Sequence, residues 1–423
     1  MSSSSSSSAD KAIFDAFEDA VEDAMAMLSA AVESSSSRPS RRTRRYVDRD
    51  REGAHDRLVR DYFADNCVYP ADFFRRRYRM RRSLFLCIVD TLGAQSPYFT
   101  QRRDCTDRLG LSPLQKCTSA LRMLAYGVAA DTVDEYLNLA QSTALECLTQ
   151  FCEGIITCFG TEYYRRPTVA DIQRLLAKAE ERGFPGMLGS IDCMHWQWRN
   201  CPVGWKGQFT RGDIKHPTII LEAVASYDLW IWHAFFGVAG SNNDINVLNQ
   251  SPLFTEVLRG EAPTVSFTVN GHEYNMGYYL ADGIYPSWPV LMKGIPLPQT
   301  EKHQYFSMRQ AAYRKDVECA FGVLKARFNI LACPGRSFSR RVLGLIMRAC
   351  VILHNMIIQD ERGDAYEMNY ETSSSFVGPT INHSAPSSFA SMLQMDAAIH
   401  NTSMFTQLQQ DLIEHVWNQR HSD

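Results

Sequence analysis

The spacing of hydrophobic residues changes once along the chain and divides it into two structured regions. From Ala54 to about Lys178, apolar positions recur at helical spacing. From Gly186 the pattern changes to short runs rich in Ile, Val, Phe and Trp, at 189–196, 216–226, 229–238 and 276–282. Runs of this composition and length are typical of β-strands. The pattern therefore predicts an all-helical region followed by an α/β domain.

Local sequence features refine the helical region. Ser112-Pro113 places an N-cap residue before a proline at the first helical position, which predicts a helix that runs to Gly127. A short helix over 132–140, a break at 141–143 and a helix over 144–156 then suggest a helix-turn-helix-like arrangement. The last of these helices contains no Arg or Lys. A plain helical bundle therefore remains as good an interpretation as a module that reads DNA bases.

Acidic residues interrupt the predicted strands and the helix that follows them. Asp192 lies inside an otherwise apolar strand, and Asp282 ends another strand before a turn at Gly283 and Pro286. A buried carboxylate is costly unless a positive charge offsets it. Glu318 lies on a predicted helix over 314–328, beside an apolar stripe formed by Val317, Phe321, Leu324 and Phe328. Three carboxylates that meet at one point would suit two hard divalent cations.

Two further residues are candidates for the same site. Asp244 follows Asn243 at the start of a predicted helix over 245–258, so it is either a capping residue or an additional ligand. His195 lies on the same strand as Asp192. Basic residues follow on and after the Glu318 helix, and we expect Arg314, Lys325, Arg336, Arg340 and Arg341 to bind DNA backbone phosphates.

Composition adds limits to this picture. The 423 residues are 45% hydrophobic with a net charge of −3, so overall charge does not indicate a nucleic-acid binder. The 12 cysteines show no C-x-x-C pair, which favours reduced thiols in an intracellular protein and disfavours a zinc site. No apolar run reaches the roughly 18 residues of a membrane span.

Four segments follow from these patterns. Residues 1–53 hold a Ser-rich start, an acidic amphipathic stretch over 10–33 and an Arg-rich linker over 38–45. The acidic stretch is either an isolated helix or a docking site for a partner, and the linker is a nuclear localisation signal, a DNA-contacting arm or a solvated spacer. We expect residues 54–180 to form the helical domain and 181–360 to form the α/β domain. Residues 361–423 form a mostly disordered tail with one C-terminal helix over 405–417.

The order of strands, helices and acidic residues resembles the Harbinger group of DDE transposases. The resemblance rests on five segments in the same order: Gly189–Trp196, Gly240–Asp244, Leu280–Pro286, Val317–Phe328 and Cys350–Asn355. The helical region before them also resembles the N-terminal part of the family. Where the family often has Gly directly before Tyr-Pro, this chain has Gly283-Ile284 before Tyr285-Pro286. That departure affects no acidic residue.

The resemblance implies a ribonuclease H-like fold in which Asp192, Asp282 and Glu318 are the catalytic, metal-binding triad. It implies a Mg²⁺- or Mn²⁺-dependent DNA endonuclease or transposase, whose cleaved 3′-hydroxyl then attacks target DNA. It also implies a homo-oligomer, a separate Myb-like DNA-binding partner and a nuclear location, with a cytoplasmic location in the absence of that partner. The alternative is a relative recruited by the host as a catalytically silent chromatin or protein-interaction module.

Overall fold

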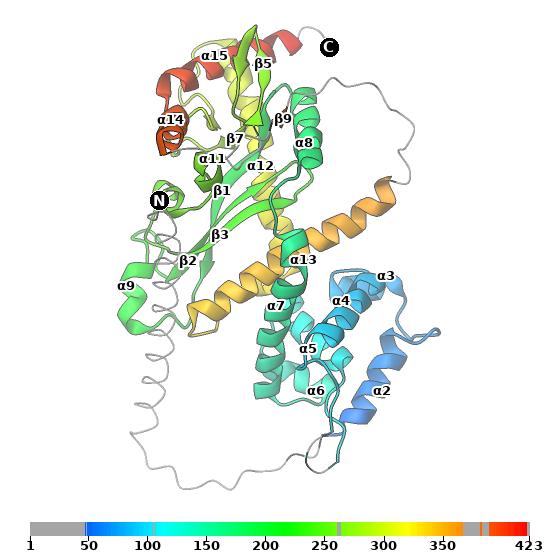
Figure 1. The fold of residues 1–423 in the computed structure, drawn as a ribbon. Helices are drawn as coiled ribbons and strands as arrows, with labels where there is room; N and C mark the ends of the chain where they lie inside the picture. The colour runs from blue at the N-terminus through cyan, green and yellow to red at the C-terminus, as the bar shows by residue number, and fades with distance from the viewer. Residues whose placement is uncertain are drawn as a thin grey trace.

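The computed structural model describes residues 47, 49–103, 105, 107–259, 264–366, 381–382 and 389–420. The Ser-rich start, the acidic stretch over 10–33 and the Arg-rich linker lie outside these residues. Figure 1 shows an α/β part above and a helical part below, with α13 (Arg340–Tyr366) crossing between them.

A five-stranded sheet forms the centre of the α/β part. Its order is β3-β2-β1-β7-β8, with β1 antiparallel to β2, β2 antiparallel to β3, and β7 and β8 parallel to β1 and each other. The strands are β1 (Met187–Gln197), β2 (Thr218–Ala225), β3 (Ile231–Ala239), β7 (Tyr278–Ala281) and β8 (Leu291–Lys293). The fold is mixed α/β with a ribonuclease H-like core and an N-terminal helical region, as the sequence predicted.

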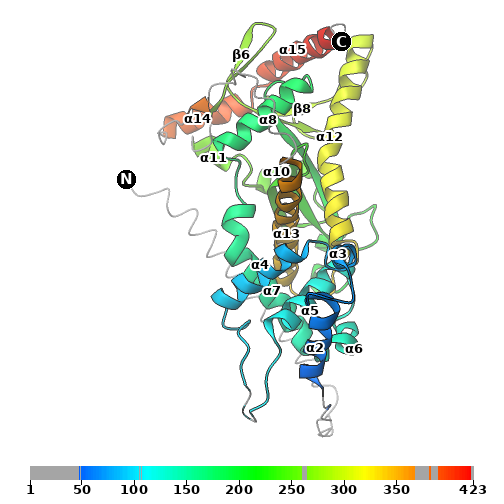
Figure 2. The same cartoon turned by 90° about the vertical axis from the view of Figure 1, so that its right-hand side faces the viewer.

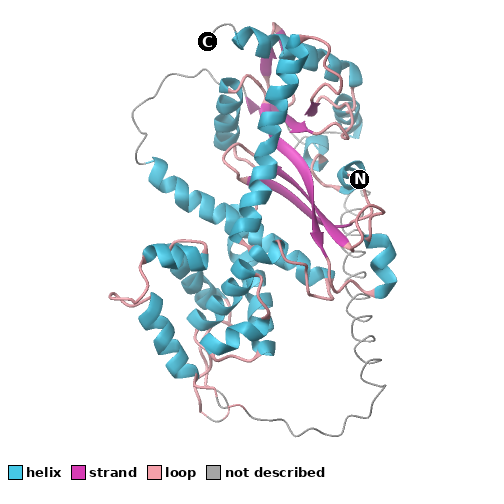
Figure 3. Cartoon of the chain, turned by 180° about the vertical axis from the view of Figure 1, so that it is seen from behind, coloured by secondary structure: helices cyan, strands magenta, loops and turns pink. Residues whose placement is uncertain are grey.

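Helices cover both faces of this sheet. In Figure 3 the helix α12 (Glu301–Arg327) lies in front of the strands, and Figure 1 shows it behind them. The predicted apolar stripe of α12 is confirmed, because Val317, Phe321, Leu324 and Phe328 are all buried. The remaining elements of this part are α8 (Val169–Glu181), η2 (Val203–Trp205), α9 (Lys206–Phe209), α10 (Asp244–Gln250), α11 (Thr255–Arg259), β4 (Thr264–Val265), β5 (Phe267–Val269), β6 (His272–Tyr274), η3 (Asn329–Leu331), β9 (Ile381–Asn382), α14 (Phe389–Ile399) and α15 (Thr402–Arg420).

The helical part packs against α13 through a long helix, α7 (Gln141–Tyr163). It also contains α2 (Arg51–Tyr62), α3 (Ala71–Tyr78), α4 (Arg82–Gln95), α5 (Pro113–Tyr126), η1 (Ala130–Val133) and α6 (Asp134–Leu137). Ser112 caps α5 in a capping box with Gln115, as the N-cap prediction required. The predicted break at 141–143 is wrong, because α7 begins at Gln141 and continues to Tyr163. One face of this helix is buried from Ala144 to Phe159, which stabilises it as a single helix.

Two other predicted helix boundaries are wrong. The helix predicted over 245–258 is divided into α10 and α11, since Pro252 cannot continue a helix. The tail predicted to be mostly disordered beyond residue 360 also contains the end of α13 and α14, whereas its predicted C-terminal helix over 405–417 is confirmed by α15. Ile399 and Leu412 are buried, so these last helices are held by packing against the α/β part.

The helix α13 contains a long apolar stretch. Over Arg340–Arg362 it is long and apolar enough to cross a membrane, contrary to the expectation that no such stretch exists. Within the protein, however, 72% of its most apolar stretch is buried. Asn355 donates to the carbonyls of Tyr163 and Ile231 and accepts from the Ile231 N–H, which joins α13 to α7 and β3. The helix has the packing of a core helix.

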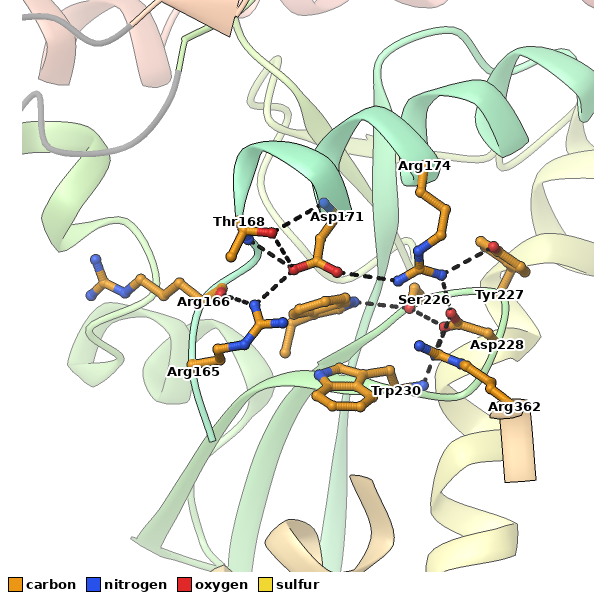
Figure 4. Close-up of polar contacts among 11 residues, drawn as sticks. Arg165, Arg166, Thr168, Asp171, Arg174, Ser226, Tyr227, Asp228, Trp230 and Arg362 are labelled. Atoms are coloured by element: carbon orange, nitrogen blue, oxygen red, sulfur yellow. Dashed lines mark hydrogen bonds and ion pairs between the residues drawn. The ribbon is translucent and has the colours of Figure 1, made fainter. Parts of the chain in front are cut away.

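A buried charge network joins α8, the turn between β2 and β3, and α13 (Figure 4). Asp228 in the turn accepts hydrogen bonds from Arg174 of α8 and Arg362 of α13. Asp171, the capping-box residue of α8, accepts from Arg165 at 2.7 Å and lies 3.6 Å from Arg174. Three elements that are distant in the sequence are thereby tied to one end of the sheet.

Candidate metal centre

The register of the parallel strands brings two of the predicted acidic residues together. Ser190 of β1 lies opposite Leu280 of β7. The same register, continued by two residues, places Asp192 opposite Asp282, and neighbouring strands lie about 4.8 Å apart. Asp282 follows the last residue of β7 directly, and its Oδ1 accepts the Ile284 N–H at 2.7 Å. Asp192 and Asp282 thus lie on or next to paired strands, and the charge of Asp282 contributes to the raised pKa of Asp192.

Buried polar contacts fix α12 over these strand ends. Ser190, two residues before Asp192 and on the same face of β1, accepts a hydrogen bond from the Val317 N–H at 3.1 Å. The buried Gln310 donates to the Ala281 carbonyl at 2.9 Å and to the Met292 carbonyl at 3.1 Å. The Ser190 hydrogen bond holds α12 next to the strand of Asp192. The two Gln310 hydrogen bonds hold it at the ends of β7 and β8.

Arg314 connects the third predicted acidic residue to the first. Its Nη2 lies 2.8 Å from Glu318 Oε1, one turn away on α12, and its Nη1 lies 3.5 Å from Asp192 Oδ2. The structure therefore places Arg314 between two of the predicted metal ligands, although the sequence suggested a contact with DNA phosphate. Glu318 is the most accessible member of the group, with 42% of its side chain exposed against 19% for Asp192.

The site has an excess of negative charge. The pKa of Asp192 is raised to about 6. Burial is the largest cause and the charges of Asp244 and Asp282 also raise it, whereas Arg314 and the Cys193 N–H lower it. Burial, and then the charge of Asp282, also raises the pKa of Asp244. Buried carboxylates that also lie near other carboxylates resist ionisation, and a bound cation stabilises their charged form.

Asp244 is not the N-cap of α10, so of the two roles that the sequence left open, capping is excluded. Asn243 is the N-cap of α10, with its side chain accepting the Asn246 N–H at 2.9 Å, and Asp244 is the first helical residue. Asp244 is therefore free of a capping hydrogen bond and lies close enough to Asp192 to affect its pKa.

The carboxylates fit a divalent cation in chemistry but do not form a closed set of ligands. Within the part of the chain that the structure describes, no group of three or more His, Cys, Asp or Glu side chains is close enough to hold a metal ion. The donors are all oxygens, which Mg²⁺, Mn²⁺ and Ca²⁺ prefer to softer ligands. Arg314 explains the open arrangement, because it draws Glu318 and Asp192 onto its own guanidinium.

His195 lies on the opposite face of β1 from Asp192, since the two are three residues apart. Its Nδ1 lies 2.9 Å from Thr218 Oγ1. Burial lowers its pKa, and Arg211 lowers it further. The neutral imidazole is thus held by β2, and the structure does not bring it into the carboxylate group.

The predicted DNA-binding residues fall into two places. Lys325 is half-buried on α12, burial lowers its pKa, and no described residue forms an ion pair with it. Arg336 lies beside Trp198 at the far end of β1, where Asn200 donates to its carbonyl. Trp198 lies six positions after Asp192 along the strand direction, which corresponds to about 20 Å. Arg340 and Arg341 begin α13 in the same area, and Arg341 lies 3.8 Å from Glu153.

One acidic residue near the site escaped the sequence analysis. Glu222 is fully buried on β2 opposite Cys193, with Oε1 3.2 Å from His233 Nε2 and with Oε2 lacking a hydrogen-bond partner in the described structure. It is the one charged residue in the run Thr218–Ala225. Like Asp192, Glu222 is a carboxylate inside an apolar strand, and this feature identifies it in the sequence as well.

Fold and site together define a class: a ribonuclease H-like protein with acidic residues on adjacent central strands and on the helix that covers them. A family model described as plant transposon protein matches residues 161–365, and the chain belongs to this Harbinger-type family. A second model, a domain of unknown function (DUF8418), matches residues 55–93. No solved structure matches the chain.

Curated relatives agree with this family at low identity. A protein of Arabidopsis thaliana named ALP1-like is 27% identical over 59% of this chain and 62% of its own length. HARBI1 of Xenopus laevis, named as a candidate nuclease, is 23% identical over 69% of this chain and 79% of its own length. A second Arabidopsis protein, named antagonist of like heterochromatin protein 1, is 27% identical over 59% and 63%. The chain thus spans less than two thirds of both Arabidopsis relatives.

Proposed function

We propose that this protein is a metal-dependent DNA endonuclease of the transposase type, which cleaves phosphodiester bonds. The observation that supports the proposal is the parallel pairing of β1, which carries Asp192, with β7, which Asp282 follows directly, next to α12, which carries Glu318. Families of nucleases use such carboxylates for two divalent ions. The relatives named as candidate nucleases support the same activity.

In this proposal Asp192, Asp282 and Glu318 hold Mg²⁺ or Mn²⁺, with Asp244 as an additional oxygen ligand. When bound, the ions supply an activated water and neutralise the charge on the leaving oxygen. In the absence of the ions, the two contacts of Arg314 compensate the charges of Asp192 and Glu318. Its release leaves a guanidinium one turn before Glu318, where it binds one DNA phosphate, while Lys325, two turns after Glu318, binds another.

The assembly belongs to the same proposal. We propose that the protein acts in the nucleus as a homo-oligomer with a Myb-like DNA-binding partner, and that specificity for a DNA sequence comes from that partner. The absence of Arg and Lys from residues 141–156 supports this division of labour, because a DNA-reading helix carries such residues.

One observation favours a second candidate, a catalytically silent interaction module. Arg314 already satisfies Asp192 and Glu318 by ion pairs, so the carboxylates have a stable arrangement that needs no metal. The relative named as an antagonist of a heterochromatin protein is in keeping with such a role.

A nicking assay on supercoiled plasmid separates these two functions. We expect the wild-type protein with Mg²⁺ to convert supercoiled DNA to open circles. Loss of several kcal/mol of charge stabilisation in the variant Glu318→Gln should slow nicking by at least about 100-fold. The matched control is Glu301→Gln, an exposed glutamate at the start of the same helix, which should nick at the wild-type rate. A wild-type protein that leaves the plasmid supercoiled, or a Glu318→Gln variant as fast as wild type, would contradict the nuclease.

A further inference from the structure

Six arginines lie within eight residues at the end of α3 and the start of α4. They are Arg75, Arg76, Arg77, Arg79, Arg81 and Arg82, which we call the α3–α4 arginine cluster. The cluster lies inside residues 55–93, the part that matches a domain of unknown function. Nothing in the proposed nuclease site uses it, and the chain as a whole has a net charge of −3.

Acidic side chains compensate only part of this cluster. Arg75 Nη2 lies 2.5 Å from Glu361 Oε1, and Arg81 Nε lies 3.5 Å from Asp360 Oδ2. Both acids belong to the end of α13, and Glu361 also lies 2.7 Å from Arg327 Nη2 of α12. Even so, 56% of the Arg75 side chain stays exposed. These two carboxylates therefore pair with Arg75 and Arg81 of the cluster and also with Arg327 of α12.

The other four arginines are held by aromatic rings and a thiol. The guanidinium of Arg76 lies 4.5 Å from the ring centre of Phe73, that of Arg77 lies 4.0 Å from Tyr69, and that of Arg79 lies 5.5 Å from Tyr126. Arg82 donates to Cys67 Sγ at 3.0 Å. Among the residues that the structure describes, none of these four forms an ion pair with a carboxylate. The Nε groups of Arg79 and Arg82 are also buried without a hydrogen-bond acceptor.

Uncompensated arginines that are fixed in place are the preferred ligands of phosphate groups. Stacking on an aromatic ring orders the guanidinium in advance, so that less side-chain entropy is lost when it binds. Arginine pairs with phosphate through parallel hydrogen bonds, and clustered positive charge on one face is the mark of a nucleic-acid backbone site. An acidic protein partner would present separate carboxylates to the cluster. A nucleic-acid backbone presents evenly spaced phosphates, which match a row of cations better.

The position of the cluster relative to the candidate metal centre supports the same ligand. Figure 2 shows α3 beside the lower end of α12, and Glu361 connects Arg75 to Arg327 at that end. Glu318 lies nine residues before Arg327 on the helix, about 13 Å along its axis. That length corresponds to about four base pairs of duplex DNA. A duplex whose scissile phosphate is at Glu318 would therefore reach the cluster with its next few phosphates.

We propose that the α3–α4 arginine cluster binds the phosphate backbone of duplex DNA without regard to sequence. The inference rests on the proposed function, since it names the place where that substrate is held beyond the cleavage site. It gives the helical region a role in DNA binding through the cluster and not through α7, whose residues 141–156 contain no Arg or Lys. Arg76, exposed and without a carboxylate partner among the described residues, is the residue that tests it most cleanly.

The test is a binding titration with a fluorescently labelled duplex of arbitrary sequence. Fluorescence anisotropy measures the affinity at several salt concentrations, in the presence of EDTA. EDTA removes divalent metal, so a failure of the nuclease proposal leaves this measurement unaffected. Arg76→Gln should reduce the slope of log affinity against log salt by about 1, and Arg75→Gln combined with Arg76→Gln by about 2. Arg76→Lys keeps the charge and should keep a slope close to wild type.

The control is Arg348→Gln, which removes the same charge from an exposed arginine on α13 and should leave the slope unchanged. Thermal melting of Arg76→Gln at the wild-type temperature establishes that the fold is kept. A double variant with the wild-type salt slope would overturn the proposal, and so would an equal loss in Arg348→Gln. Binding of a polyglutamate peptide in preference to DNA would also overturn it, in favour of an acidic protein partner.

Discussion

Asp192 has a cost for the folded protein that only a cation or a proton removes. Burial raises its pKa from the ordinary value of 3.8 to about 6. The folded state therefore bears no penalty from this group below pH 3.8, where the carboxyl is protonated in both states. The penalty grows as the pH rises and is complete above pH 6, so stability from this residue is lost with rising pH.

The variant Asp192→Asn should make the metal-free protein more stable at neutral and alkaline pH. A difference of about two pKa units corresponds to about 3 kcal/mol, and the lost contact with Arg314 reduces the gain, so we expect about 1–2 kcal/mol in the free energy of unfolding at pH 8. Denaturant unfolding in EDTA measures it. The gain should vanish below about pH 4, and a variant less stable than wild type at pH 8 would contradict the assignment.

The sequence could identify residues of the site but not their pairings. Asp192 and Asp282 were predicted because a carboxylate inside an apolar run needs a charged partner, and the register brings them together. The contact of Arg314 with both Asp192 and Glu318 depends on the angle and depth of α12 on the sheet, which spacing along one helix does not define. Gln310 was missed for the same reason, since its acceptors are carbonyls on two distant strands.

At the scale of elements, the turn between β2 and β3 depends on one carboxylate. Asp228 has 12% of its side chain exposed and accepts hydrogen bonds from Ser226, Arg174 and Arg362. Burial alone would raise its pKa, but the arginines and the Ser226 hydroxyl outweigh burial, and the pKa is lowered. Its stabilising contribution is therefore present above pH 3.8 and is lost as the pH falls through the lower folded value.

The variant Asp228→Asn should destabilise the protein strongly. Two guanidiniums at the joint between α8 and α13 would lose their common counter-charge, which costs about 3–5 kcal/mol when the pair is buried. Chemical denaturation at pH 7 gives the value, and the difference from wild type should shrink at acid pH. The control Asp213→Asn removes an exposed carboxylate paired with Arg211 and should change stability by less than about 1 kcal/mol. Equal effects of the two substitutions would contradict the role of the network.

Element types were predictable, whereas element ends often were not. The helix start predicted at Ser112 agrees with the structure because the capping interaction is local, and Thr168 caps α8 in the same way. The start of α12 at Glu301 was missed, since the preceding stretch is rich in proline and polar residues. The full length of α7 was missed as well, because its apolar positions are covered by α5 and α13, which no local pattern shows.

At the scale of the whole molecule, the α/β part extends beyond the stretch that identifies the family. The family match ends at residue 365, yet α15 packs on α12 and on the β5–β6 hairpin. The buried Asp411 of α15 accepts hydrogen bonds from His272 and Tyr274, and Gln409 donates to the carbonyl of Lys293 at the edge strand β8. The helix predicted over 405–417 is confirmed, but its packing on a distant hairpin cannot be derived from local sequence patterns.

The central claim is that Asp192, Asp282 and Glu318 together hold a divalent metal ion. Electron paramagnetic resonance of free Mn²⁺ during titration into the protein measures this directly. We expect saturable binding by the wild-type protein at neutral pH, and an affinity at least tenfold lower for Asp282→Asn, which removes one ligand from the group. Asp213→Asn, an exposed acidic residue elsewhere, should bind as the wild type does. A wild-type protein with no saturable Mn²⁺ binding, or an Asp282→Asn variant with unchanged affinity, would contradict the account.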